Sequence, residues 1–312
     1  MLANLKKAVI VVYREENAED FQQIARRVKR LDSSLGVAMV PEFLTSKMVP
    51  PEFLQLPLLV IYLCNPPETE FAIAAKIAVK EMSKIEEYEH FKRNNLPCLP
   101  IERFRWGMEL DPKIYGDWVV LKPEHIQSTG KDVNMVSTKL IPTLTIQNFP
   151  EEHLIRQDSY LVQNFIKCGE TPTHFRVTVF LNEVLFSSRA RSKLSYPKTD
   201  SSLMLNTTVA SNMRENRSTQ LFQDEEINNF ARMVANAFPQ NPLLGIDILK
   251  DDLTGKLYVL EVNLGGNTWH FSSLIGEGYR FDLGGRNAMV RQYNAWDKAA
   301  SALVRKTHEL AK

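Results

Sequence analysis

Long apolar runs, charge of one dominant sign and paired cysteines are all missing from this 312-residue sequence. No apolar stretch approaches the ~20 residues that a membrane-spanning helix needs. The apolar part of the N-terminus is too short for a signal peptide. A formal net charge of +1 gives no reason to expect nucleic acid or an anionic membrane as a partner. The three cysteines are scattered and lack metal-ligand spacing, which favours a reducing, cytoplasmic setting.

Catalytic patterns built on a strong nucleophile are missing too. Neither a Ser/His/Asp nor a Cys/His arrangement is recognisable. Residues 128–132 are not a Walker A loop, because the glycine spacing is wrong and Asp132 replaces the Ser or Thr of that loop. The composition, with 44% hydrophobic and 24% charged residues, is that of an ordinary globular protein. The length allows two or three lobes with cores of their own.

Residues 1–67 have the pattern of a small α/β lobe. Residues 8–13, 36–40 and 58–63 are continuous apolar runs, which are typical of buried strands. Residues 21–31 carry apolar side chains at helical spacing with Arg and Lys between them. Strand–helix–strand order at these distances predicts a compact α/β unit.

The fold class predicted for the whole chain is α/β, or α+β, in three parts. Residues 1–67 form the first lobe, residues 68–162 a helix-rich segment with a second lobe, and residues 163–312 a third lobe. Strands and loops dominate from Trp118 up to a helix that begins near Asp224. A last helix is predicted at the C-terminal end.

The most informative pattern is an acidic hairpin over residues 244–249 and 257–264. Side chains alternate along a strand, so Glu261 and Asn263 share one face, and strand pairing can bring Asp247 to it. Two carboxylates and an amide are hard oxygen ligands of the kind that Mg²⁺ takes, with positions left for water and phosphate. An amphipathic hairpin with one solvated face explains these three residues equally well.

Three upstream segments are suited to a nucleotide. A strand over residues 118–122 ends in Lys122, and in residues 128–132 Gly130 can bring backbone N–H groups close to a phosphate. A strand over residues 160–166 has a polar break and can present backbone groups to an adenine edge. Each segment also has an ordinary interpretation: a lysine extending to water, a generic turn and a core strand.

Two further segments can hold a ligand. A hairpin is predicted around Asn182, and its arginines suit phosphate or carboxylate through their planar fork: Arg176, Arg189 and Arg191. Residues 265–273, rich in glycine and small polar residues, follow the acidic strand directly. They either grip a ligand or form a tight turn packed by Trp269.

In this order, the pieces resemble the ATP-grasp superfamily, which includes D-alanine–D-alanine ligase, glutathione synthetase and the glutamate ligase that modifies a ribosomal protein. The resemblance runs from about Lys84 to Ser273. Lys84, followed by Leu96-Pro97, looks like the helix with the first ATP lysine. The resemblance implies an ATP-grasp fold, with a small N-terminal α/β lobe and two α+β lobes that clamp ATP.

The resemblance also implies roles for individual residues. The implied nucleotide site contains Lys84, Lys122, Ser128, Thr129, Gly130, Lys131, Gln163, Asn164, Phe165, Ile166 and Glu170. The implied ligands of two Mg²⁺ ions, with Mn²⁺ as the alternative metal, are Asp247, Glu261 and Asn263. The implied catalytic residues are Arg176, Arg191 and Lys122. His174 stands where the family often has an acidic residue for the ribose, and Glu170 is the candidate to replace it.

The implied function is an ATP-dependent carboxylate–amine ligase that forms an acyl phosphate and releases ADP and phosphate. Its substrates would be a small acid and an amine, such as an amino acid or a peptide, with no nucleic acid and no membrane involved. A phosphotransferase acting on a hydroxyl and a nucleotide-gated binding module without turnover stay open as alternatives. A homodimer also stays open as the oligomeric state. The sequence does not identify the acid or the amine.

Overall fold

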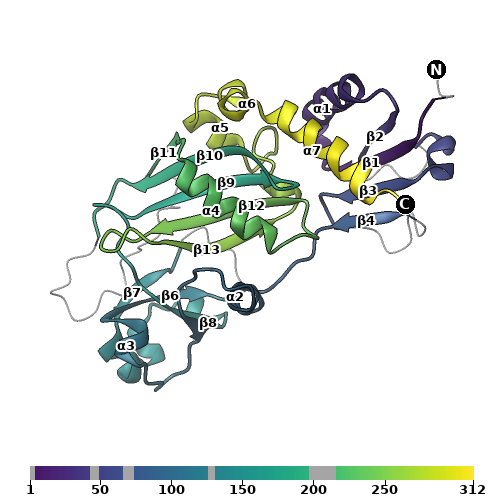
Figure 1. Cartoon of the computed structure of the whole chain (residues 1–312). Helices are drawn as coiled ribbons and strands as arrows, with labels where there is room; N and C mark the ends of the chain where they lie inside the picture. Colours follow the sequence, from purple (N-terminus) through teal and green to yellow (C-terminus); the bar gives the residue numbers. More distant parts are fainter. Residues whose placement is uncertain (1–3, 43–48, 66–73, 126–130, 197–215) are drawn as a thin grey trace.

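The computed structural model describes residues 4–42, 49–65, 74–125, 131–196 and 216–312. Within these residues the strands form three separate sheets (Figure 1). No helix in the described ranges is both long and apolar enough to cross a membrane.

The N-terminal sheet is parallel, with the strand order β2-β1-β3-β4. Its elements are β1 (Lys7–Tyr13), α1 (Ala18–Leu31), β2 (Leu35–Pro41), β3 (Leu58–Tyr62) and β4 (Ala75–Ala78). The central strands are buried on both faces, which is why they read as continuous apolar runs in the sequence. The predictions for β1, α1, β2 and β3 are confirmed. β4 was not predicted, since its segment was expected to be helix-rich.

The middle sheet is antiparallel, with the order β5-β8-β6-β7. Its elements are α2 (Lys84–Arg93), β5 (Ile101–Arg103), α3 (Pro112–Tyr115), β6 (Trp118–Pro123), β7 (Asn134–Ser137) and β8 (Tyr160–Asn164). A capping box fixes the start of α2: Ser83 Oγ accepts the Glu86 N–H, and the Glu86 carboxylate accepts the Ser83 N–H at 2.8 Å. Lys84 is therefore the first residue of the helix.

The C-terminal sheet is antiparallel, with the order β11-β10-β9-β12-β13. Its strands are β9 (Thr173–Phe180), β10 (Glu183–Ser192), β11 (Arg217–Leu221), β12 (Leu243–Lys250) and β13 (Leu257–Leu264). Its helices are α4 (Glu225–Asn236), α5 (Glu277–Asp282), α6 (Arg286–Tyr293) and α7 (Ala295–Leu310). Asp224 caps α4 by accepting the Glu226 N–H at 2.9 Å, so the helix predicted near Asp224 is confirmed. The acidic hairpin and the closing helix are confirmed as β12–β13 and α7.

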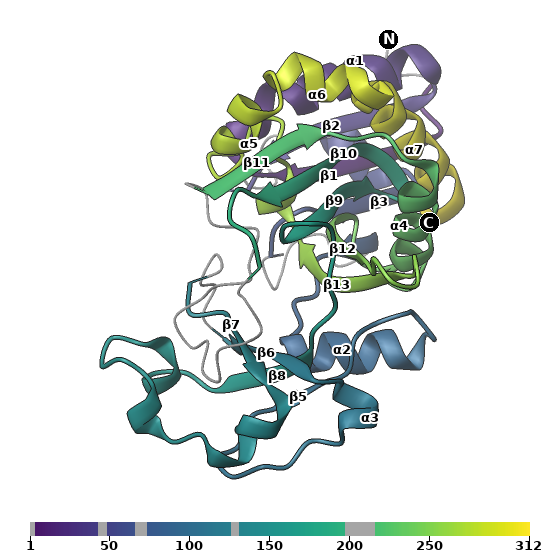
Figure 2. The ribbon, with the colours of Figure 1, turned by 90° about the vertical axis from the view of Figure 1, so that its left-hand side faces the viewer.

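The first and third lobes share one hydrophobic core, whereas the middle sheet has a core of its own. Trp269 and Phe271 pack with Phe21 of α1 and with side chains of α7. The chain end is fixed to the first lobe, because the Leu58 N–H donates to the Lys312 carbonyl at 3.0 Å. Figure 2 shows the middle sheet below this joint body, with β13 as the strand of the C-terminal sheet that faces it.

Candidate active site

The three predicted metal-ligand residues and Arg176 come together on one face of the C-terminal sheet. Arg176 on β9 pairs in register with Asp247 on β12, and Asp247 pairs with Glu261 on β13. Asn263 lies opposite Gly245, two residues along the same strands. Paired residues of neighbouring strands project to the same face. The sheet register therefore gathers two carboxylates, an amide and a guanidinium.

Hydrogen bonds hold this group together. Arg176 donates to both carboxylate oxygens of Asp247, through Nε at 2.6 Å and through Nη2. The Asn263 Nδ2 atom lies 3.4 Å from Oδ2 of Asp247 and 3.4 Å from Oε1 of Glu261. Burial lowers the pKa of Arg176, but the adjacent Asp247 charge outweighs it and the net shift is upward. The Arg176–Asp247 pair is thus a fixed element of the site.

The donor set fits a hard divalent cation. Burial, and then the charge of Asp247, raises the pKa of the Glu261 carboxyl group. A cation bound by both carboxylates would relieve this repulsion, and Asn263 adds an amide oxygen. No three His, Cys, Asp or Glu side chains of the described residues form a metal cage. The arrangement suits Mg²⁺, which keeps water and phosphate oxygens in its coordination sphere.

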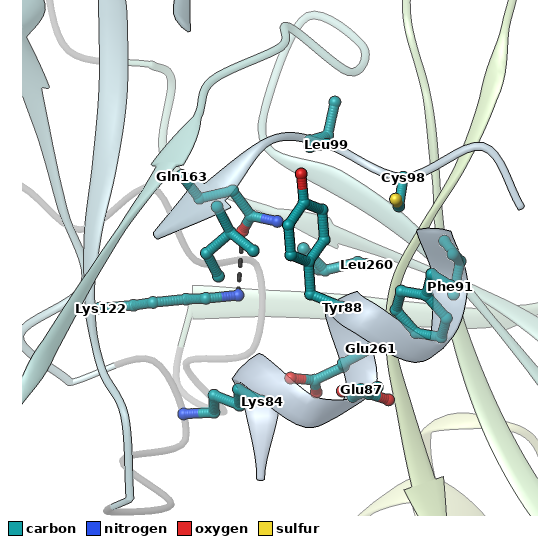
Figure 3. A pocket seen from close by; sticks show the side chains of 12 residues that line it. Lys84, Glu87, Tyr88, Phe91, Cys98, Leu99, Lys122, Gln163, Leu260 and Glu261 are labelled. Atoms are coloured by element: carbon teal, nitrogen blue, oxygen red, sulfur yellow. Dashed lines mark hydrogen bonds between the residues drawn. The ribbon is translucent and has the colours of Figure 1, made fainter. Parts of the chain in front are cut away.

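Two partly buried lysines face the acidic group from the middle lobe. Lys122 on β6 donates to Oε1 of Gln163 at 2.9 Å, and Lys84 at the start of α2 donates to the Pro123 carbonyl at 2.5 Å. Burial lowers the pKa of both ammonium groups, that of Lys122 to about 8. Lys84, Lys122, Gln163 and Glu261 line one cleft (Figure 3). The two expected lysines are therefore brought together, opposite the strand that carries the acidic residues.

Glu87 is part of this cleft and was missed by the sequence analysis. It lies one turn after Lys84 on α2, and its carboxylate accepts the backbone N–H of Val262 on β13. Burial, followed by the charge of Glu261, raises the pKa of Glu87 to about 8. The two carboxyl groups lie close together in Figure 3. The spacing of Glu87 from Lys84 was the only signal in the sequence, and it does not reveal which strand the helix faces.

The strand expected to hold adenine is the central strand β8. Its backbone pairs with β5 on one side and with β6 on the other, and the Asn164 side chain donates to the Tyr115 carbonyl at 2.6 Å. Gln163 is engaged by Lys122. The Phe165 N–H also donates to the Trp118 carbonyl, at 3.1 Å. The role of residues 163–166 in holding adenine stays a prediction. The Phe165 ring meets Tyr196 edge-on, with the ring centroids 5.7 Å apart.

His174 and Glu170 occupy different environments. His174 is buried beside the acidic group, with Nε2 3.9 Å from Oδ1 of Asp247. Burial, and then the charge of Arg176, lowers its pKa to about 3, so the imidazole is neutral. Glu170 is exposed in the turn before β9.

Several predicted site residues do not join the group. Arg191 pairs with Thr173 and is exposed. It is on the opposite face of the hairpin from Arg176, which pairs with Ser188. Lys131 is exposed. Three expected phosphate-loop residues lie outside the described ranges, namely Ser128, Thr129 and Gly130.

The segment after β13 is mainly an anchor to the first lobe. Trp269 and Phe271 are fully buried, and the Trp269 indole N–H donates to Oδ2 of Asp20 on α1 at 2.9 Å. This agrees with the turn packed by Trp269. His270 lies between these two aromatic residues in the sequence but contacts a different element. Its ring stacks on Tyr279 of α5, with the ring centroids 4.5 Å apart.

Comparisons with known proteins identify the fold. No protein-family model and no curated protein sequence matches the chain. Among solved structures, a RiPP-associated ATP-grasp ligase from Chryseobacterium gregarium, in complex with ADP and with a leader and core peptide, has a TM-score of 0.50 and 9% identity, covering 97% of each chain. The D-cycloserine synthetase DcsG has a TM-score of 0.49 and 12% identity, covering 96% of this chain and 99% of its own.

A third similar structure is the D-alanine–D-alanine ligase from Bacillus anthracis, with a TM-score of 0.46, 14% identity, and coverage of 96% of this chain and 99% of that one. At 9% identity the Chryseobacterium structure shows the fold and not the reaction. The chain has the ATP-grasp fold, and the prediction of this fold is confirmed.

Proposed function

We propose that the protein is an ATP-dependent ligase that joins a carboxylic acid to an amine and releases ADP and phosphate. The observation that carries this proposal is the pairing of charges across one cleft. Lys84 and Lys122 lie on one side, and Glu261, which pairs with Asp247 on the neighbouring strand, lies on the other. Lysines suit the phosphates of a nucleotide and buried carboxylates suit its metal, so the two sides together match a metal–nucleotide complex. The fold shared with an enzyme that was solved with ADP supports the same proposal.

The metal-binding residues of the proposal are Asp247, Glu261 and Asn263. When bound there, Mg²⁺ would neutralise the phosphate charges and the charge that develops during phosphoryl transfer. Arg176 positions one of the proposed metal ligands, because its two hydrogen bonds fix the Asp247 carboxylate against rotation. Glu87 holds the strand between Glu261 and Asn263 through the Val262 N–H.

In this proposal, Lys84 and Lys122 orient the phosphates of the nucleotide. Both ammonium groups are partly desolvated, so their interaction with a phosphate is stronger than it would be in water. The cleft that they line encloses only about 10 Å³, which is room for about one water molecule. We therefore infer that this cleft widens when a nucleotide enters.

The chemical steps need no nucleophile from the protein. An oxygen of the acid substrate attacks the γ-phosphorus, the bond from this phosphorus to the ADP oxygen breaks, and an acyl phosphate forms. The amine nitrogen then attacks the acyl carbon and loses a proton to solvent, and phosphate leaves. Positioning and exclusion of water are the protein's main contributions. This agrees with the missing Ser/His/Asp and Cys/His patterns.

A trapping experiment tests the proposal. The protein is incubated with ATP, Mg²⁺ and a panel of amino acids, short peptides and small carboxylic acids, and ADP is measured. Hydroxylamine then replaces the amine, and a ligase gives a hydroxamate together with ADP and phosphate. A phosphotransferase gives ADP without a hydroxamate, and a binding module gives no ADP. Glu261→Gln is the control variant, because it should keep the fold and abolish turnover.

A further inference from the structure

A second set of buried polar side chains lies on the face of the C-terminal sheet that carries Arg176. Ser188 on β10 pairs with Arg176, and Arg217 and Thr219 on β11 pair with Ser192 and Ala190 of β10. This register places all three side chains on the Arg176 face. We call Ser188, Arg217 and Thr219, together with His270 and Tyr279, the Arg217 cluster.

Four polar atoms of the Arg217 cluster have no hydrogen-bond partner within the described part of the chain. They are Ser188 Oγ, Thr219 Oγ1, Arg217 Nε and His270 Nδ1. Ser188, Thr219 and His270 are 1%, 6% and 3% exposed, and the Arg217 side chain is 8% exposed. Buried polar groups are nearly always paired, because an unpaired one loses its hydration without compensation. Four such atoms in one cluster indicate a binding site for a polar ligand.

The ring of Tyr279 holds the cluster together. The His270 ring stacks on it, and the Arg217 guanidinium carbon lies 4.7 Å from its centroid. The Arg176 guanidinium carbon is 6.0 Å from the same centroid. The Arg217 cluster is therefore continuous with the Arg176–Asp247 pair.

The neighbouring segment fixes His270 in place. Arg280 donates to the carbonyls of His270 and Ser273 at 2.9 and 2.8 Å. A Cβ added at Gly276 would lie 2.5 Å from the His270 carbonyl oxygen, so glycine allows this close packing. Asp282 of α5 lies 3.6 Å from Nη2 of Arg217 and leaves Nε unengaged. His270 and Arg217 are thus positioned by contacts with the protein alone, as a preformed site requires.

The four unpaired atoms favour a ligand that accepts hydrogen bonds. The Nε–H of arginine can only donate, and both hydroxyls and one nitrogen of a neutral imidazole can donate as well. Burial, followed by the charges of Arg176, Arg280 and Arg217, lowers the pKa of His270 to about 3. Three guanidinium groups thus lie near His270, although Arg176 pairs with Asp247 and Arg217 with Asp282. These guanidinium groups oppose an ammonium group, and the donors that they and the hydroxyls offer favour an acceptor. A carboxylate accepts several hydrogen bonds with its two oxygens and carries the matching charge.

We propose that the Arg217 cluster binds a free, non-reacting carboxylate of the substrate, so that one substrate is an amino acid or a peptide bound by its carboxyl end. This inference rests on the proposed ligase function and names the substrate class. β10 and β12 are two strand spacings apart, roughly 10 Å. A small amino acid held at Ser188 and Arg217 therefore has its other end near the Arg176–Asp247 pair.

Two variants test the site. Thr219→Val removes an unpaired buried hydroxyl with little change of shape, so the melting temperature of the ligand-free protein should stay the same or rise. Arg217→Lys keeps the charge and removes the Nε–H donor. In both, KM for the amino acid or peptide should rise at least about tenfold, while KM for ATP stays within about twofold. Thr307→Val is the matched control, because Thr307 is a buried threonine of α7 whose hydroxyl donates to the Leu303 carbonyl. It should leave both KM values unchanged.

The probes are the L- and D-forms of the common amino acids and a set of dipeptides, each offered as the amine substrate together with a separate carboxylic acid. Each is used as the free acid and as the carboxamide, with ATP present and ADP release as the readout. The free acid should exceed its amide at least about tenfold in kcat/KM. Equal use of acid and amide, or unchanged KM values in both variants, would overturn the inference.

Activity found only with acids and amines that lack a second carboxylate would overturn it too, and would leave the ligase proposal standing. Failure to bind a fluorescent ADP analogue would instead count against the ligase proposal itself.

Discussion

The carboxylate of Glu87 on α2 accepts the backbone N–H of Val262 on β13, between the proposed metal ligands Glu261 and Asn263. This bond links the helix that carries Lys84 to the strand that carries the acidic residues. It places the buried carboxyl group of Glu87 beside Glu261. Burial and the charge of Glu261 raise the pKa of Glu87 to about 8. The Glu87 carboxyl group is therefore mainly protonated at neutral pH.

Glu87→Gln should stabilise the nucleotide-free protein in a pH-dependent way. The folded-state pKa of Glu87 lies above its unfolded value, so the unfolded state gives up its proton first as the pH rises. Between about pH 4.5 and pH 8 the wild type loses stability from this group, and above pH 8 the loss is complete. The glutamine does not titrate, so its advantage in urea unfolding should grow from pH 5 to pH 8 and then level off.

Glu87→Ala is the matched control for the hydrogen bond. It leaves the buried Val262 N–H unpaired and creates a cavity, so it should destabilise the protein by about 1–3 kcal/mol or more at acidic pH. A Glu87→Gln advantage that is constant from pH 5 to pH 9 would show that the carboxyl group does not titrate in this range.

Nucleotide affinity should fall above about pH 8 because of Lys122. Burial, together with the charge of Lys84, lowers the pKa of Lys122 to about 8, whereas a bound polyphosphate favours the protonated form. At higher pH the lysine must therefore take up a proton when ATP binds. The dissociation constant should rise by up to about tenfold per pH unit. Isothermal titration calorimetry at pH 9, in buffers with different ionisation enthalpies, should detect this proton uptake.

Lys122→Arg is the control for the pH effect. Arginine stays charged in proteins, so the affinity of this variant should be nearly independent of pH between 7 and 9. If wild type and Lys122→Arg lose affinity in parallel, another group is responsible.

The sequence predicts strands and helices well where one physical requirement dominates. Continuous apolar runs can only be satisfied in a sheet that is buried on both faces, as β1 and β3 are. The alternation in the acidic hairpin is likewise sufficient to place Asp247, Glu261 and Asn263 on one face. β4 is different: it has four residues, of which only Ile77 is buried, and its partner β3 is more than ten residues away. So short a segment carries too little periodicity to be recognised.

The site is less predictable because its contacts join distant segments. In the sequence, Glu87 looks like an ordinary surface residue of a helix. It becomes a buried acid only because α2 packs against β13. Arg191 was predicted from sequence order, but strand register decides the face of each side chain, and it separates Arg191 from Arg176. Arg217 had no recognisable pattern, since its contacts come from distant segments, namely β10 and α5.

Asp20→Asn should destabilise the protein and weaken the anchor after β13. The buried Asp20 carboxylate accepts hydrogen bonds from the indole N–H groups of Trp269 and Trp296, at 2.9 and 3.1 Å, and from Arg286 Nε at 2.9 Å. An asparagine removes the charge and turns an NH₂ group toward these donors. We expect a loss of roughly 3 kcal/mol in the free energy of unfolding, with a shift in tryptophan fluorescence.

Asp32→Asn is the control for Asp20→Asn, because Asp32 also sits at α1 but pairs with the half-exposed His308 near the surface. It should cost less than about 1 kcal/mol. Equal losses in the two variants would mean that the Asp20 contacts contribute no more than a surface pair.

Gly245→Ala should disturb Asn263 through Thr268. A Cβ at Gly245 would lie 2.5 Å from Cγ2 of Thr268, which is buried against the same strands. Thr268 also donates through Oγ1 to the Asn263 carbonyl at 3.3 Å, so its displacement should move a proposed metal ligand. Overpacking of this kind costs about 1–3 kcal/mol. Thr268→Ser keeps the hydroxyl and removes Cγ2. In a double-mutant cycle, the Gly245→Ala/Thr268→Ser variant should therefore recover the melting temperature and the turnover that Gly245→Ala loses. Strictly additive effects in the cycle would contradict the clash.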